Sequence, residues 1–157
     1  MGEKFLEKLV ACWETRGAKP GMGTTLTEIQ AFEAKHELLL PADLREYFLR
    51  VNGMTTAARG DTDNDGFRFY SLSEVVPLGV VWSPQSEPSP SGLDHLFVIG
   101  DFLQECYWYA IRLDRSGTEG CSVYFIGPPV RKIAESFERF VELYMSESTL
   151  LHPDGSV

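Results

Sequence analysis

Cysteine is scarce in this chain, and its three cysteines, Cys12, Cys106 and Cys121, are an odd number at unrelated spacings. Such a set does not make a disulfide framework, so we expect reduced thiols. Long hydrophobic runs are also missing, because the apolar stretch at residues 78–82 is too short to span a bilayer. The first ten residues carry charges inside any apolar core that a signal peptide would need. The expected location is therefore the cytoplasm.

Positive charge is in short supply as well. The chain has 14 Lys and Arg against 23 Asp and Glu, which gives a net charge of −9. Phosphate binding needs clustered Lys and Arg, so we do not expect direct binding of nucleic acid. An acidic protein steers basic partners into contact, which favours a protein partner. The length of 157 residues and the 43% hydrophobic share suit one globular domain.

The residue patterns of catalysis are largely lacking. The three histidines, His36, His95 and His152, are scattered without metal-ligand spacing, and no Gly-x-Ser-x-Gly elbow is present. Cys106 and His95 would form a thiol–imidazole pair only if the fold brought them together. A buried cysteine in an aromatic strand is the more common arrangement. We therefore expect neither an enzyme nor a cofactor.

One pattern is reminiscent of a metal site. Residues 61–66, Asp-Thr-Asp-Asn-Asp-Gly, match the first half of a calcium-binding loop. The bidentate Glu that should complete the loop is replaced by Leu72, and Glu74 is out of register. Asp, Asn and Gly are also the preferred residues of turns. The pattern favours an acidic turn that leads into a strand, with weak calcium binding as the alternative.

The stretch with the clearest boundaries is residues 25–53, which predict two short helices joined at a proline-marked corner. Thr25 and Glu28 have the spacing of a capping box at the start of the first helix. Pro41 suits the first position of the second helix, which carries an apolar stripe with helical spacing. The Asn-Gly pair at residues 52–53 closes that helix, because glycine adopts a left-handed conformation without a Cβ clash.

The remaining elements follow from hydrophobic periodicity. Amphipathic helices are predicted at residues 3–15 and 133–145. Strands are predicted at residues 67–72, 96–101, 106–114 and 121–126, with a hairpin loop at 115–120. Pro77 keeps the segment around it from being a central strand, and the Pro/Ser-rich residues 83–92 predict a surface loop. We expect an α+β domain over residues 1–157, with a largely antiparallel sheet, about four helices, a core at about 25–145 and a frayed tail at 146–157.

A set of residues in the helix pair follows a pattern that a known family shares: Ile29, Phe32, Glu33, Leu40, Pro41, Leu44, Tyr47, Phe48, Asn52 and Gly53. The pattern is an I-x-x-[FL]-E helix, a Leu-Pro corner and a helix that ends in Asn-Gly. It resembles the opening signature of the SMI1/KNR4 family, also called the SUKH superfamily. The resemblance continues, in order, at residues 69–74, 99–100, 109–114, 120–124 and 134–140. This chain departs from the family at residues 101–106, where a wider loop with two exposed apolar residues replaces a glycine-rich turn.

The resemblance implies a binding module without chemistry of its own. Members of the superfamily are largely bacterial immunity proteins that neutralise toxins, many of them nucleases or deaminases, while others regulate cell-wall synthesis or belong to eukaryotic complexes. The charge of −9 is compatible with occlusion of a basic nuclease. We expect the contacts on acidic loops, at Asp61, Asp63, Asp65, Asp101, Phe102 and Glu105. Ordinary solvated loops are the alternative at these positions. A regulatory scaffold and a calcium-responsive or enzymatic domain are the alternatives for function.

Overall fold

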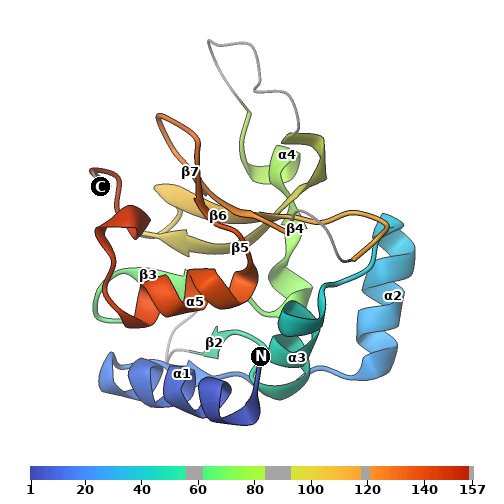
Figure 1. Cartoon of the computed structure of the whole chain (residues 1–157), viewed down its shortest axis with the longest axis horizontal. Coiled ribbons are helices and arrows are strands. Elements are labelled where there is room, and N and C mark those ends of the chain that lie inside the picture. The colour runs from blue at the N-terminus through green and yellow to red at the C-terminus, as the bar shows by residue number, and fades with distance from the viewer. Residues whose placement is uncertain (56–61, 84–92, 118–120, 156–157) are drawn as a thin grey trace.

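The computed structural model describes residues 1–55, 62–83, 93–117 and 121–155 (Figure 1). Its α-helices are α1 (Glu3–Thr15), α2 (Leu26–His36), α3 (Ala42–Arg50), α4 (Leu78–Val81) and α5 (Phe137–Met145). Its strands are β1 (Lys19–Pro20), β2 (Met54–Thr55), β3 (Phe67–Phe69), β4 (Val76–Pro77), β5 (Leu96–Phe102), β6 (Tyr107–Arg112), β7 (Val123–Ile126) and β8 (Arg131–Ala134). Short 3₁₀ helices lie at η1 (Leu72–Glu74), η2 (Leu93–His95) and η3 (Thr149–Leu151).

The expected α+β fold with a largely antiparallel sheet is confirmed. The larger sheet has the order β3-β5-β6-β7-β8, and β4 also pairs with β5. All of these described pairs are antiparallel. The predicted hairpin is the β6–β7 pair, in which Tyr109 is opposite Phe125. Residues 118–120 of its loop, and residues 84–92 of the Pro/Ser-rich segment, lie outside the described residues.

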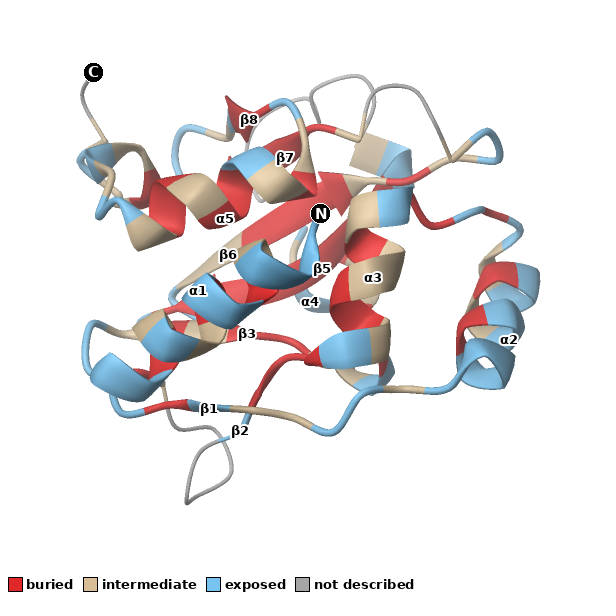
Figure 2. Ribbon diagram, turned by 60° about the horizontal axis from the view of Figure 1, so that its bottom comes forward, coloured by how far each residue is buried: buried red, intermediate tan, exposed pale blue. Residues whose placement is uncertain are grey.

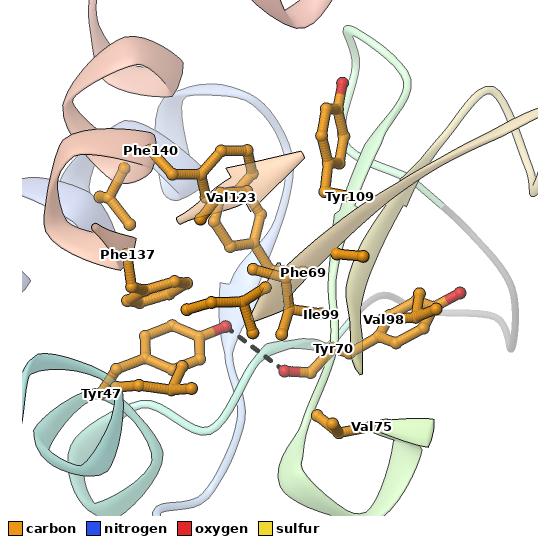
Figure 3. Packing of buried hydrophobic residues seen from close by; sticks show 14 of the residues in the cluster. Tyr47, Phe69, Tyr70, Val75, Val98, Ile99, Tyr109, Val123, Phe137 and Phe140 are labelled. Atoms are coloured by element: carbon orange, nitrogen blue, oxygen red, sulfur yellow. Dashed lines mark hydrogen bonds between the residues drawn. The ribbon is translucent and has the colours of Figure 1, made fainter. Parts of the chain in front are cut away.

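Three helices, α1, α3 and α5, pack on one face of this sheet, while α2 stands to one side (Figure 1, Figure 2). The space between sheet and helices is filled largely by aromatic rings, as Figure 3 shows. The Phe140 ring lies 5.5 Å from Phe69 and 5.1 Å from Tyr109, and Tyr47 lies 4.7 Å from Phe137. Aromatic pairs at these distances add to the stability from burial alone. Together they join α3 and α5 to the sheet.

The corner between α2 and α3 depends on one buried acid, Glu33. Its carboxylate accepts a hydrogen bond from the backbone nitrogen of Leu40 at 3.0 Å and pairs with Arg45 at 2.5 Å. The expected capping box of Thr25 and Glu28 is present at the start of α2. Pro41 is the N-cap of α3, one position before the predicted place. The acid of the I-x-x-[FL]-E pattern therefore ties the end of one helix to the start of the next.

The Asn-Gly pair at residues 52–53 connects the end of α3 to the residues that follow β3. Asn52 has a φ of 45°, and its side chain accepts a hydrogen bond from the backbone nitrogen of Leu72 at 2.8 Å. Gly53 has a φ of 82°, and a Cβ atom there would lie 2.5 Å from the backbone nitrogen of Ser71. Both the left-handed conformation and the close approach require glycine at this position.

The last helix begins later than predicted. The sequence predicted a helix over residues 133–145, but Ile133 belongs to β8 and α5 starts at Phe137. Ser136 is the N-cap, and its hydroxyl accepts a hydrogen bond from the backbone nitrogen of Arg139 at 3.1 Å. Ile133 and Phe137 are four residues apart and both buried, so their spacing imitated one helical face.

The prediction of a frayed tail is wrong as far as residue 155. Leu151, in η3, is only 1% exposed, and its backbone oxygen accepts a hydrogen bond from the Tyr109 hydroxyl at 2.7 Å. Arg131 donates to the backbone oxygen of Leu150 at 2.9 Å, and its guanidinium lies 4.2 Å from the centre of the Phe125 ring. A buried leucine and side-chain bonds to its backbone hold this segment against the sheet.

Candidate partner-binding site

The two acidic loops singled out in the sequence lie next to each other. Residues 62–66 lead into β3, and residues 103–106 connect β5 to β6. The backbone nitrogen of Leu103 donates a hydrogen bond to the backbone oxygen of Gly66 at 2.9 Å, and Phe67 pairs with Phe102 across the strands. Both loops lie at the end of the sheet that points to the left in Figure 1. Asp65, Leu103, Glu105 and Glu147 are exposed at this end, and we call the surface that they form the acidic end.

Asp63 is not on the surface of this end. It is 3% exposed, and one carboxylate oxygen accepts hydrogen bonds from the backbone nitrogens of Asp65 and Phe67, both at 2.9 Å. The other oxygen accepts from the Tyr144 hydroxyl at 2.6 Å. Burial raises the pKa of the Asp63 carboxyl, although these hydrogen bonds act in the opposite direction. Asp63 therefore holds the turn together and is not available to a partner.

Asp101 has the same role in the second loop. It is 1% exposed and accepts hydrogen bonds from the Tyr70 hydroxyl at 2.9 Å and from the backbone nitrogen of Glu105 at 3.3 Å. Burial again raises the pKa of this carboxyl, while Tyr70 and Arg68, whose guanidinium is 3.7 Å away, act against the rise. Buried Asp101 therefore holds the loop of residues 103–106 through its hydrogen bond to Glu105.

The expectation that Phe102 is exposed is wrong. The sequence placed two exposed apolar residues in this loop, but Phe102 is 5% exposed and packs 4.8 Å from the Phe67 ring and 5.2 Å from the His152 ring. Leu103 is exposed as expected, at 47%. β5 continues through Phe102, and all 7 of its residues are buried.

The backbone of the second loop has an unusual conformation. Leu103, Gln104 and Glu105 are consecutive non-glycine residues with φ values of 54°, 52° and 66°. Left-handed geometry costs such residues about 1–2 kcal/mol each, so the surrounding contacts must hold them there. The bonds from Leu103 to Gly66 and from Glu105 to Asp101 supply those contacts. These hydrogen bonds fix the loop backbone from which the exposed side chains of Leu103 and Glu105 project.

Of the six predicted contact residues, Asp65 and Glu105 are exposed, Asp63, Asp101 and Phe102 are buried, and Asp61 lies outside the described residues. Glu147 was missed, because its segment was expected to fray. Arg16 connects it to the site, with guanidinium contacts of 3.3 Å to both Glu147 and Asp65. The Arg16 side chain is 10% exposed, whereas those of Asp65 and Glu147 are 51% and 78% exposed. Asp65 and Glu147 thus face solvent, while Arg16, which pairs with both, is largely buried.

The geometry of residues 62–66 favours the acidic turn over a calcium loop. Asp63 is 3% exposed, and both of its carboxylate oxygens accept hydrogen bonds from protein donors. Within the described part of the chain, no three His, Cys, Asp or Glu residues are grouped so that they could hold a metal ion. The acidic-turn interpretation accounts for every contact of Asp63.

The proposed pair of Cys106 and His95 is not formed. His95 precedes the first residue of β5, and Cys106 follows its last residue. A strand of 7 residues separates them by about 20 Å, far beyond a thiol–imidazole contact. Cys106 is also exposed, and not buried as the sequence had indicated.

Together, the fold and the site define an α+β domain with an acidic surface built from loops at one end of its sheet. Residues 23–143 match the SMI1 / KNR4 family (SUKH-1), and the chain belongs to this family. The chain is also similar to "Uncharacterized protein YobM" of Bacillus subtilis (strain 168), with 37% identity over 54 residues. That stretch is 32% of this chain and 29% of YobM. No helix among the described residues has both the length and the apolar character needed to cross a membrane.

Proposed function

We propose that this protein is a non-catalytic binding module, a bacterial immunity protein that binds a basic toxin and occludes its active site. The single observation that carries the proposal is the acidic end, where Asp65, Glu105 and Glu147 are exposed at the same end of the sheet as the exposed apolar side chain of Leu103. Protein surfaces recognise complementary partners through apolar and charged side chains together. Membership of the SMI1/KNR4 family supports a binding role.

The charge of the whole chain supports the same partner. At −9 it attracts a basic protein over a distance of about one Debye length, and the acidic end gives this attraction a direction. A nuclease presents Lys and Arg side chains to the phosphates that it binds, and these are complementary to an acidic surface. Masking of its basic groove would need neither a cofactor nor a metal in the present chain, and no direct contact with nucleic acid or a membrane. The proposed location is the cytoplasm.

Co-expression tests the proposal. The gene beside that of this protein is expressed as a candidate toxin, with and without the wild-type chain. We expect the wild-type chain to restore growth and to co-purify with the toxin. If the chain binds an endogenous regulatory complex and has no effect on the neighbouring gene product, the scaffold alternative replaces the immunity role.

A further inference from the structure

A pocket with a volume of about 490 Å³ lies at the other end of the β5–β6 hairpin, away from the acidic end. It is bordered by the C-terminal end of α2, by the residues before β5 and by those after β6. The backbone nitrogen of Leu39 donates to the backbone oxygen of Asp114 at 3.0 Å, which joins two of these segments. Figure 1 shows the chain after β6 beside the upper end of α2. We call it the His36–His95 pocket.

The floor of this pocket is apolar and partly aromatic. Phe97, Leu38 and Leu113 line it and are buried. The His36 ring lies 5.2 Å from the Phe97 ring and 4.6 Å from the Phe32 ring. Burial lowers the pKa of His36, so its imidazole is neutral at pH 7. The His36 and Phe97 rings are nearly perpendicular, at 80°, and Phe97 is the more buried of the two, so His36 is the ring on which a planar group can stack.

The rim of the pocket carries an excess of carboxylates. Glu37, Asp94 and Asp114 line it, against the single guanidinium of Arg115. Hydrogen bonds from the hydroxyl and backbone nitrogen of Ser116 lower the pKa of Asp114, which is therefore an anion at pH 7. Asp94 is exposed and has no hydrogen bond or ion pair to any described residue.

Arg115 shows what kind of group this rim accepts. Its guanidinium lies 3.7 Å from the Glu37 carboxylate, and both side chains are highly exposed, at 82% and 77%. An ion pair with such exposure contributes little and exchanges readily. Arg115 thus forms an ion pair with Glu37, one of the carboxylates with which the cation of a partner would pair.

We propose that the His36–His95 pocket receives an arginine side chain of a basic protein partner, which displaces Arg115 from Glu37. Its planar guanidinium stacks on the His36 ring while the carboxylates of Asp94 and Glu37 neutralise its charge. Arginine fits better than lysine because its flat, weakly hydrated head stacks on aromatic rings. The inference goes beyond the acidic end, since the pocket is a separate contact point that can be tested without a toxin.

The test uses the full chain labelled with ¹⁵N and titrated with Nα-acetyl-arginine amide. The neutral isostere Nα-acetyl-citrulline amide is the control ligand. We expect saturable chemical-shift changes for the arginine probe, confined to residues 36–39, 94–97 and 113–116, and none that saturate for citrulline. Changes that do not saturate, that spread over the surface or that appear equally with citrulline would overturn the proposal.

Variants separate the pocket from general charge effects. Asp94→Asn and Glu37→Gln remove exposed carboxylates, and each should weaken the affinity for the arginine probe roughly two- to fivefold. Arg115→Ala should strengthen it by a similar factor, because Glu37 is then free. Glu7→Gln, exposed on α1 and outside this pocket, is the matched charge control and should change nothing. An Arg115→Ala variant that binds no more tightly than the wild type would contradict the displacement.

Discussion

Replacement of Asp63 by alanine should destabilise the protein, although this residue was expected at a partner contact. The change removes the acceptor of three hydrogen bonds, from the Asp65 and Phe67 nitrogens and the Tyr144 hydroxyl. Tyr144 is 1% exposed and Phe67 4% exposed, so solvent does not replace the lost acceptor for either. Each buried donor left without a partner costs about 1–3 kcal/mol.

The gain from removing a buried carboxylate offsets part of this loss. Desolvation raises the pKa of Asp63, which shows that its hydrogen bonds do not fully offset the burial of its charge. We therefore expect a net loss of about 2–4 kcal/mol in the free energy of unfolding, or roughly 5–15 °C in Tm. Urea unfolding followed by tryptophan fluorescence measures it, because Trp13 is fully buried 5.4 Å from Phe69.

The neighbouring Asp65→Ala is the matched control. Its side chain is 51% exposed and it lies two residues away, so its loss should change stability by less than about 1 kcal/mol. An Asp63→Ala variant as stable as Asp65→Ala would refute the structural role of Asp63.

The pH dependence gives a second readout of the same residue. Because the folded-state pKa of Asp63 is raised, its titration contributes stability that is complete below the unfolded pKa of about 3.9. That contribution is lost as the pH rises through the folded-state pKa. The stability advantage of the wild type over Asp63→Asn should therefore shrink between acidic and neutral pH. An advantage that grows over this range would contradict the raised pKa.

Three further changes test the fold. Glu33→Ala leaves the buried Leu40 nitrogen and Arg45 without their acceptor, and should cost about 2–4 kcal/mol in urea unfolding, more than Glu33→Gln. Gly53→Ala places a Cβ atom 2.5 Å from the Ser71 nitrogen at a φ of 82°, and should cost at least about 2 kcal/mol; a neutral effect would show that this turn is not fixed. Leu151→Ala should cost about 2–4 kcal/mol, whereas a truly frayed tail would tolerate it without change.

The helix pair was readable from sequence because its signals are local. The capping box joins Thr25 to a residue three positions away, and Gly53 closes α3 by its own backbone freedom. Two apolar runs separated by turn residues likewise located the β6–β7 hairpin. Such features need no knowledge of distant parts of the chain.

The candidate site was only partly readable, because burial of its acids depends on distant partners. Asp63 is held by Tyr144, 81 positions away, and Asp101 by Tyr70, 31 positions away. A run of aspartates in a turn has the same local pattern whether its side chains point outward or inward. Glu147 and the His36–His95 pocket depend on tertiary contacts in the same way. The sequence thus located the acidic loops and left open which of their carboxylates face solvent.

The most direct test of the proposed function is the affinity of the purified chain for the neighbour-encoded toxin, measured by calorimetry at two salt concentrations. The decisive variant is Asp65→Asn/Glu105→Gln, which removes two exposed charges and keeps Glu147 as the partner of Arg16. Glu7→Gln/Glu142→Gln, on α1 and α5, is the control with the same change in net charge.

We predict that the acidic-end variant binds roughly five- to thirtyfold more weakly than the wild type, with a smaller dependence on salt, while the control binds like the wild type. Equal affinity of all three proteins, or no binding by any, would contradict the assignment of the acidic end as the toxin-binding surface.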